Sequence, residues 1–420
     1  MLKKWSFFQN SGLSFKILTS LFTLKFIIGI SVYYVYTYYY TDRKTADIFK
    51  YFDDAKYLYK HVYLNSPLKF WKIILGIQNE ASEIHNHLKE THYWFKPHAS
   101  NVFNDNRTVI RFNAVIYLFS FGYYHVHTLV LSTLSFIGLT GIYRTFNIFY
   151  KEQKKELLIA CFLIPSVLFW GSGILKESIL IFGIGVFVFV FTQFLYFQKK
   201  RLYLIVIFVT LGLLAITKAY VLLVLIPSIL AWVIIHFSKA KHVGLIFLLI
   251  NLGIILLAFN AKHLHPSLDL TGNIKYKQRD FINVARDTKA GSTIQLGVLD
   301  DSSWSYIKNI PQAFINGLLR PSIVEIKNFF FAFSAFENTV LLFLIFLAII
   351  FFNKPTEEQL PIIYFSLYFT LLLTLLIGLT VPVLGAIVRY KIPFMPFIVA
   401  LLLVCIDFRK LYLFLKLKKT

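Results

Sequence analysis

The sequence predicts an all-α polytopic membrane protein with about ten transmembrane helices and both termini in the cytoplasm. Hydrophobic residues make up 57% of the 420 residues and charged residues only 15%, whereas charged residues reach about a quarter in soluble domains. Apolar segments of nearly spanning length recur along the chain, and basic residues gather between them. Because no linker or internal repeat interrupts this pattern, we expect residues 1–420 to form a single membrane domain.

The first predicted span, 17–40, is too long for the apolar core of a cleaved signal peptide and lacks a small-residue cleavage site before Asp42. We therefore interpret it as a retained signal anchor, interrupted only by Lys25 and a few hydroxyl residues. The other predicted spans share an apolar composition and a length near the roughly 20 residues that cross a bilayer. They are 125–143, 157–172, 178–197, 202–217, 219–236, 243–260, 338–352, 361–382 and 392–407.

The distribution of Lys and Arg orients these spans, because short cytoplasmic loops collect basic residues. With the N-terminus inside, every basic cluster falls on the cytoplasmic side. The clusters are Arg144 with Lys151, Lys154 and Lys155, then Lys199, Lys200 and Arg201, then Lys239 and Lys241, and finally Arg409, Lys410, Lys416, Lys418 and Lys419. Two long segments, about 41–124 and about 261–337, then lie outside with interfacial helices. We treat 108–122 as interfacial, because counting it as a span would place the later basic clusters outside.

The formal net charge of +22 does not indicate a nucleic-acid partner, since the basic residues lie in short runs between apolar segments. The lipid bilayer is the partner that the composition implies. Cys161 and Cys405 lie inside apolar runs, so we expect two buried thiols rather than a disulfide or a metal site. The sequence has no Walker A loop, dinucleotide fingerprint, metalloprotease helix or nucleophile elbow. This argues against an ATP-driven pump and a classical hydrolase.

Two adjacent carboxylates, Asp53 and Asp54, come shortly after the first span. They belong to 47–59, whose spacing fits a short amphipathic helix at the membrane surface. On such a helix Asp47, Tyr51 and Asp54 share one face, and Asp53 lies on another. An acid pair can serve as a general base or as metal ligands. The alternative is an acidic surface helix whose charge is balanced by neighbouring lysines.

Basic residues mark the later external turns. Lys176 and Glu177 follow the glycine-rich turn 171–173 at the start of a helix, where free amide donors and a cation suit a phosphate. A plain helix connection with a snorkelling lysine is the alternative. Lys218 stands between two apolar runs, and an intramembrane ionisable residue is a functional candidate by default. We therefore expect Lys218 at a tight external turn or facing a hydrated cavity.

Arg320 is the best phosphate ligand of the second external segment, because it carries a bidentate fork and a permanent charge. An ion pair with Glu325, about one helical turn away, is the alternative. Arg389 and Tyr390 precede a proline-broken stretch at the mouth of the last span, where irregular backbone is tolerated only beside a cavity or under protein cover. The supporting candidates are Glu177 and four charged residues of the second external segment: Arg279, Arg286, Glu325 and Glu337.

The histidines do not predict a metal site. His125 and His127 lie at the outer end of the second predicted span, without a carboxylate at metal-site spacing on the same helix face. Four others are scattered in the first external segment: His85, His87, His92 and His98. We expect interfacial or structural roles for all of them.

The chain resembles the GT-C superfamily of polyprenyl-phosphate-dependent integral membrane glycosyltransferases, particularly bacterial relatives of the protein mannosyltransferase and aminoarabinose transferase group. The resemblance lies in Asp53-Asp54 after the first span, in 165–170 leading to Lys176-Glu177, in 215–218 at the end of a span, and in the late Arg389-Tyr390. These short motifs follow one another over most of the chain. The family usually has an Asp or Glu near the second external turn, where this chain has a Lys-Glu pair.

The resemblance implies sugar transfer at the extracytoplasmic face of a bacterial inner membrane, in the biosynthesis of cell-envelope polysaccharide. The donor would be a polyprenyl-phosphate-linked sugar, and the acceptor a hydroxyl of a glycan, lipid or protein. Asp53 or Asp54 would deprotonate that hydroxyl, which then attacks the anomeric carbon. The residues implied to hold the departing phosphate are Lys176, Lys218, Arg320, Arg389 and Tyr390. Such enzymes differ in whether a divalent metal takes part, so the cofactor stays open.

Three other interpretations compete with this one. A Wzy-type polysaccharide polymerase or O-antigen ligase uses lipid-pyrophosphate glycans and external arginines, and it should tolerate the loss of both Asp53 and Asp54. A transporter or lipid flippase predicts internal repeats with broken helices near the midplane, whereas the polar residues here gather at one face. A structural membrane subunit without chemistry is the fourth interpretation.

Overall fold

The computed structural model describes residues 2–40, 42–43, 46–77, 88–95, 104–197, 200–265 and 268–417. Six residues used in the sequence-based predictions lie outside this part of the chain: His85, His87, His98, Lys199, Lys418 and Lys419. The described residues form two compact units. Unit 1 comprises Met1–Gly141, Val167–Val190 and Arg201–Ala219, and unit 2 comprises Ile142–Ser166, Phe191–Lys200 and Tyr220–Thr420.

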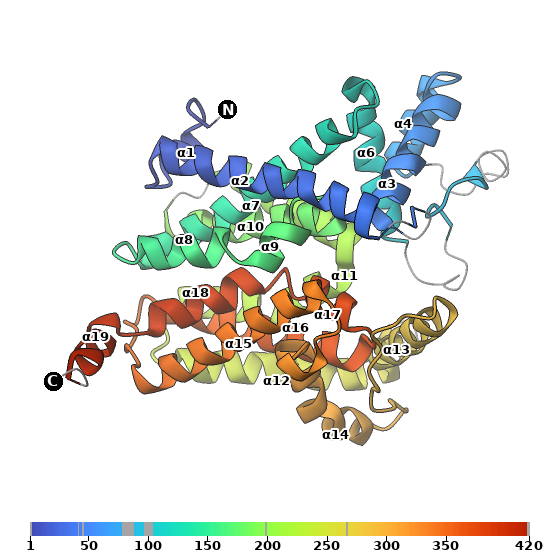
Figure 1. Ribbon diagram of the computed structural model, residues 1–420. Helices are drawn as coiled ribbons and strands as arrows, with labels where there is room; N and C mark the ends of the chain where they lie inside the picture. Colours follow the sequence, from blue (N-terminus) through green and yellow to red (C-terminus); the bar gives the residue numbers. More distant parts are fainter. Residues whose placement is uncertain are drawn as a thin grey trace. The chain divides into compact units, whose positions relative to one another are not determined.

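Unit 1 is built from helices of the N-terminal half of the chain (Figure 1). Its complete helices are α1 (Ser6–Gln9), α2 (Phe15–Tyr34), α3 (Asp47–Tyr57), α4 (Pro67–Ile74) and α6 (Asn106–Ser120). It also holds part of each of four helices that continue into unit 2: α7 (Tyr124–Phe149), α9 (Pro165–Trp170), α10 (Lys176–Tyr196) and α11 (Arg201–Ser238). Turns of π-helix extend α2 over Val35–Tyr39 and α3 over Leu58–Tyr63.

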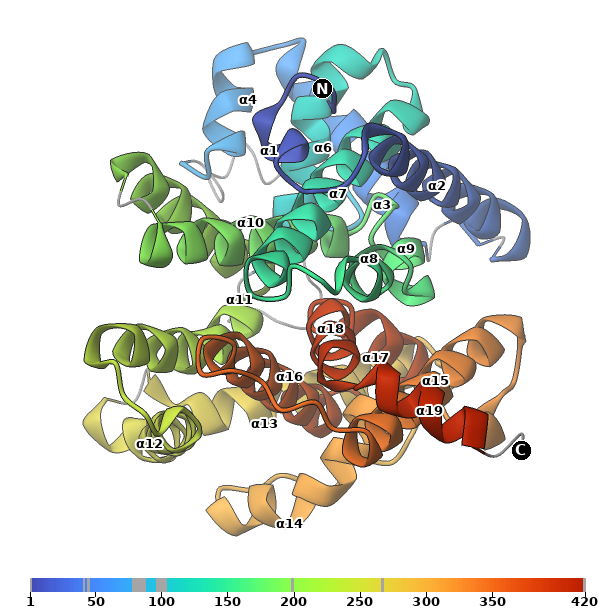
Figure 2. The same cartoon turned by 90° about the vertical axis from the view of Figure 1, so that its left-hand side faces the viewer.

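Unit 2 contains most of the long C-terminal helices, which Figure 2 shows nearly end-on. Beside its share of the four continuing helices it contains α8 (Lys154–Phe162), α12 (Val243–Leu264), α13 (Leu270–Asp287), α14 (Ser303–Phe314), α15 (Phe329–Ile350), α16 (Leu360–Thr380), α17 (Leu384–Tyr390), α18 (Met395–Cys405) and α19 (Phe408–Leu417). In this unit α18 packs against α8, α15 and α16, and α16 also contacts α12, α13 and α14.

Seven helices of the described residues are long and apolar enough to cross a membrane, or eight if the bent pair of α17 and α18 forms one span. The seven are α2 with its π-helical extension, α7, α10, α11, α12, α15 and α16. The chain is therefore an all-α polytopic membrane protein, as the sequence predicts. The expected number of ten spans is not confirmed.

Two parts of the chain differ from the predicted pattern of separate, continuous spans. The predicted span 157–172 is divided into α8 and α9, of nine and six residues, because Pro165 begins a new helix after the non-helical Leu163. The two predicted spans on either side of Lys218 are the two arms of α11, which consists of two helices joined by a kink at Lys218, where the backbone is non-helical (φ −153°, ψ 86°). The break thus lies at the residue where the sequence predicts a turn.

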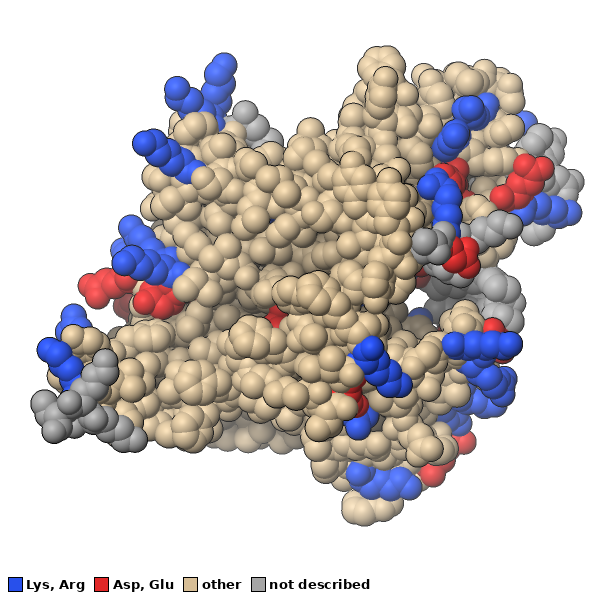
Figure 3. Space-filling model, viewed as in Figure 1, with Lys and Arg blue, Asp and Glu red and all other residues tan. Residues whose placement is uncertain are grey.

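The charged side chains of each unit gather toward the ends of its long helices (Figure 3). In unit 1, Lys and Arg lie near α1 and, at the opposite end, around α3 and α4. In unit 2 they lie near α8 and α19 and, opposite these, around α13 and α14. The surface between these ends is almost free of charge in this view, as expected for helices surrounded by hydrocarbon. Cys161 and Cys405 are free and buried, which confirms the prediction for both thiols.

Each unit contains a helix crossing so close that it requires glycine. Where α7 crosses α10, a Cβ on Gly138 would lie 2.2 Å from the Ile181 carbonyl oxygen, and one on Gly185 would lie 1.9 Å from the Gly138 carbonyl oxygen. Within unit 2, a Cβ on Gly378 would lie 1.8 Å from the Ala313 carbonyl oxygen. Small residues allow such backbone approach, which is a main source of stability between membrane helices.

We predict that Gly138→Val destabilises unit 1 by about 1–3 kcal/mol, because the α7–α10 crossing has no space for the added methyl groups. The matched control is Gly212→Val on α11, where an added Cβ would meet no atom within 4 Å. The thermal midpoint of the purified chain in bilayer discs measures both effects. Equal midpoints for the two variants would show that the crossing is not as close as described.

Candidate functional site

The face of α3 that carries Asp54 holds a neighbouring loop in place. The two Asp54 carboxylate oxygens accept hydrogen bonds from the backbone N–H groups of His92 and Tyr93, at 2.7 and 2.8 Å. The Tyr93 hydroxyl donates to Asp47 Oδ1 at 2.5 Å. Burial raises the pKa of the Asp54 carboxyl, and the two N–H donors act in the opposite direction. Asp47 and Asp54 thus share a helix face, as the spacing predicts.

Asp53 lies on the other side of α3 and is more exposed than Asp54. Its carboxylate forms a two-pronged ion pair with Arg43, whose Nη2 lies 2.7 and 2.8 Å from the two carboxylate oxygens. The Asp53 side chain remains 29% exposed. It also raises the pKa of Tyr117, although burial is the larger cause of that shift. Of the two adjacent carboxylates, Asp53 is therefore the one with access to a ligand.

The start of α10 contributes a second set of charges to unit 1. Lys176 is the first residue of this helix and pairs with Asp105, whose Oδ2 lies 2.8 Å from the Lys176 Nζ. The next residue, Glu177, pairs with Lys218 at 3.1 Å, and both of these side chains are buried. Since Lys218 marks the break in α11, this ion pair joins the break to the start of α10.

The start of α6 brings α3 and α10 together. The Tyr51 hydroxyl of α3 donates to the Asn106 side chain at 3.0 Å, and Asp105, which precedes Asn106, holds Lys176. Thr108, one turn further along α6, donates its hydroxyl to the Ile216 carbonyl oxygen of α11 at 2.6 Å. The predicted residues Asp54, Lys176, Glu177 and Lys218 therefore lie on elements that meet around residues 104–108.

Two arginines of α6, close to this meeting of elements, were not among the predicted site residues. Arg107 and Arg111 both lie over the Trp94 ring, and each also donates through Nε to a backbone carbonyl oxygen, of Trp94 and Ile73 respectively. Burial, together with the charge of Arg107, lowers the pKa of Arg111. In the sequence these arginines only interrupt an apolar segment. Their contact with Trp94 depends on tertiary packing, so spacing alone could not reveal it.

His127 has a structural role in unit 1. Its ring nitrogens lie 2.9 Å from the Ser120 hydroxyl and 2.9 Å from Asn113 Oδ1. The imidazole is buried against the rings of Phe52 and Tyr117. Within the described ranges no group of three or more His, Cys, Asp or Glu side chains could hold a metal ion.

In unit 2, Arg320 forms an ion pair with Glu325, which was the alternative to phosphate binding in the prediction from sequence. The Arg320 Nε lies 3.2 Å from Glu325 Oε1. Glu325 also accepts hydrogen bonds from the backbone N–H and hydroxyl of Ser322. Lys391 fixes the backbone of this segment, since its buried ammonium donates to the Leu318 and Arg320 carbonyl oxygens at 2.6 and 2.8 Å. The Arg320 side chain therefore extends from a firmly held backbone.

The remaining predicted residues of unit 2 lie on several different elements. Glu337 on α15 accepts from the backbone N–H and hydroxyl of Ser166, at 2.8 and 2.6 Å, and so caps the start of α9. Arg389 and Tyr390 end α17, and the Tyr390 ring contacts Phe281 of α13 with ring centroids 6.0 Å apart. Arg279 and Arg286 are exposed on α13.

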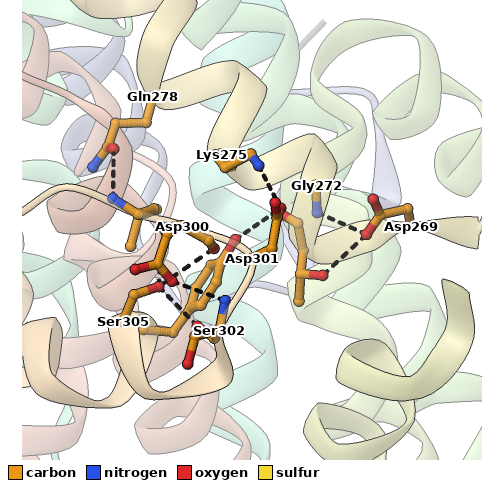
Figure 4. A network of polar contacts seen from close by, with 11 residues as sticks. Asp269, Gly272, Lys275, Gln278, Asp300, Asp301, Ser302 and Ser305 are labelled. Atoms are coloured by element: carbon orange, nitrogen blue, oxygen red, sulfur yellow. Dashed lines mark hydrogen bonds and ion pairs between the residues drawn. The ribbon is translucent and has the colours of Figure 1, made fainter.

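A network of polar contacts holds the segment that follows α13 (Figure 4). Gln278 on α13 donates to the Gly297 and Leu379 carbonyl oxygens, at 3.0 and 2.7 Å. Lys275 on the same helix forms an ion pair with Asp301. Asp269 caps the start of α13 by accepting from the Gly272 N–H at 2.8 Å, a hydrogen bond that lowers the pKa of its carboxyl. The segment 291–302 is thereby tied to α13 and to the end of α16.

Comparison with known proteins does not place the chain in a family. No protein-family model, curated protein or solved structure matches it. The resemblance to the GT-C superfamily therefore stays a prediction.

We predict that Asp54→Asn loosens the segment 88–95, because an amide group offers one acceptor oxygen where the carboxylate offers two. Backbone amide exchange in this segment should accelerate by about tenfold or more, in line with the cost of a lost buried hydrogen bond. Asp53→Asn is the matched control, since Asp53 contacts Arg43 instead of this loop. Unchanged exchange in Asp54→Asn would contradict the anchoring role.

We predict a non-additive result for the buried Glu177–Lys218 pair. Glu177→Gln and Lys218→Met alone should each destabilise the chain by about 3–5 kcal/mol, because each leaves one buried charge without its counter-ion. The double variant should cost less than either single variant. A double-mutant cycle on thermal unfolding in bilayer discs measures this coupling, and additive losses would show that the two side chains do not interact.

Proposed function

We propose that the protein is a membrane glycosyltransferase that moves a sugar from a polyprenyl-phosphate donor to an acceptor hydroxyl. The observation that supports this most is the charged set of unit 1, in which Asp105, Lys176, Glu177 and Lys218 surround the start of α10. A helix N-terminus that carries a lysine in its first turn favours an anionic phosphate. The proposal includes a cytoplasmic N-terminus and an extracytoplasmic site.

We assign the general base to Asp53. Its carboxylate is partly exposed and is not used to hold backbone, whereas both oxygens of Asp54 already accept N–H donors. Asp53 would take the proton of the acceptor hydroxyl as its oxygen bonds to the anomeric carbon. Arg43, which contacts Asp53, would orient the carboxylate. A metal ligand role for these carboxylates is a separate hypothesis.

Lys176 is the phosphate ligand in this proposal. The bond between the anomeric carbon and the phosphate oxygen breaks, and the ammonium of Lys176 and the positive end of the α10 dipole would stabilise the negative charge that the leaving phosphate gains. Lys218 is too buried for direct contact, with a side chain 3% exposed, so we assign it to positioning Lys176 through the adjacent Glu177. Arg320, Arg389 and Tyr390 of unit 2 remain hypotheses for phosphate contact.

The test is a sugar-transfer assay on the full chain in bilayer discs with polyprenyl-phosphate sugars. We predict that the native chain releases polyprenyl phosphate and that Asp53→Asn lowers turnover by at least about 100-fold, the usual size of a general-base effect. Asp42→Asn is the control for a nearby exposed carboxylate. Amide exchange over 88–95 in Asp53→Asn should stay native, which separates lost chemistry from lost structure.

A polysaccharide polymerase or O-antigen ligase gives a different result in the same assay. It would consume a lipid-pyrophosphate glycan, release no polyprenyl monophosphate, and keep its turnover in the Asp53→Asn/Asp54→Asn variant. That outcome would refute the proposed transferase.

A further inference from the structure

A pocket of about 560 Å³ lies beside the C-terminal half of α13 in unit 2. Two cationic side chains, Arg286 and Lys289, line it together with the segment 293–296 and Pro382. Pro382 follows the end of α16, which is one of the candidate membrane spans. The pocket therefore lies at the end of a span, at the level where lipid headgroups meet water.

The wall of the pocket formed by the segment 291–299 is held on several sides. The Ile294 N–H donates to the Pro382 carbonyl oxygen at 2.7 Å, and the Leu384 N–H donates to the Ser292 carbonyl oxygen at 3.0 Å. The Gln278 side chain of α13 donates to the Gly297 carbonyl oxygen of the same segment at 3.0 Å. The wall is thus already shaped for a ligand, which lowers the entropic cost of binding.

The two cations have few competing partners. The ion pair of Arg286 with Asp287 is long, at 3.8 Å, and the Arg286 side chain is 75% exposed. It also donates to the Asn283 side chain at 3.3 Å. Within the described ranges the Lys289 ammonium has no ion-pair partner. An arginine fork and a lysine point charge together match the oxygens of a phosphate group.

The rest of the lining is mainly apolar. Ile282, Ile294, Leu296 and Pro382 provide hydrocarbon surface next to the two cations. A ligand that satisfies both parts of the pocket carries a phosphate and a hydrocarbon chain. Basic pockets at the ends of transmembrane helices are suited to the headgroups of anionic lipids.

We propose that this pocket binds an anionic phospholipid of the surrounding bilayer. Its phosphate contacts Arg286 and Lys289, and the first part of an acyl chain lies along the apolar wall. The bound lipid would fasten α13 and the segment 291–302 to the membrane. This inference is independent of the proposed transferase function, because it concerns residues that take no part in the proposed reaction at α3 and α10.

The experiment measures which lipids stay bound to the purified full chain, by native mass spectrometry after incubation with phosphatidylglycerol or phosphatidylcholine of identical acyl chains. We expect preferential retention of phosphatidylglycerol. Arg286→Ala/Lys289→Ala should reduce that retention by about tenfold or more, as expected for the loss of two basic contacts with an anionic lipid. Lys277→Ala/Lys308→Ala is the control, with equal loss of charge on α13 and α14 outside the pocket.

A second variant separates pocket binding from general surface charge. Ala290→Trp keeps both cations and fills the pocket, so it should lower phosphatidylglycerol retention while the thermal midpoint stays native. Retention that is equal in the native chain and Arg286→Ala/Lys289→Ala would overturn the proposal. Complete displacement of phosphatidylglycerol by inorganic phosphate would also overturn it, because the site would then recognise a free anion rather than a lipid.

Discussion

A buried charge inside an apolar helix packing needs a counter-charge or hydrogen-bond partners, and one buried ammonium group in each unit shows how this requirement shapes its surroundings. In unit 1 the buried Lys218 ammonium pairs with Glu177, which joins the break of α11 to the start of α10. In unit 2 the buried Lys391 ammonium meets the carbonyl oxygens before Pro321. The same physical requirement therefore produces an ion pair in unit 1 and a hydrogen-bonded backbone segment in unit 2.

Within unit 1 the two carboxylates of α3 have different roles because of their environments. Asp54 is buried and anchors the segment 88–95, while Asp53 is partly exposed and pairs with Arg43. A general base must be rigidly placed and still accessible to its substrate. An anchoring carboxylate next to an accessible one satisfies both conditions on a single turn of helix.

The sequence predicts the elements of this protein better than their contacts. Apolar composition and segment length were sufficient to predict the all-α membrane fold. The residue spacing in 47–59 was sufficient to predict that Asp47 and Asp54 share a helix face. The predicted number of spans is not confirmed, and at 157–172 hydropathy alone does not register the helix break before Pro165. The partners of Lys176 and Arg107 lie 71 and 13 residues away in the chain, so that only tertiary packing determines them.

The central claim is that Lys176, at the start of α10, receives the phosphate of a lipid carrier. The most direct measurement is the equilibrium affinity of the full chain in bilayer discs for a prenyl monophosphate, compared between Lys176→Gln and Asp105→Asn. Both variants lose the same ion pair, but only the first loses the cation. We predict about tenfold weaker binding in Lys176→Gln and native or tighter binding in Asp105→Asn. Equal affinities in the native chain and Lys176→Gln would contradict the account.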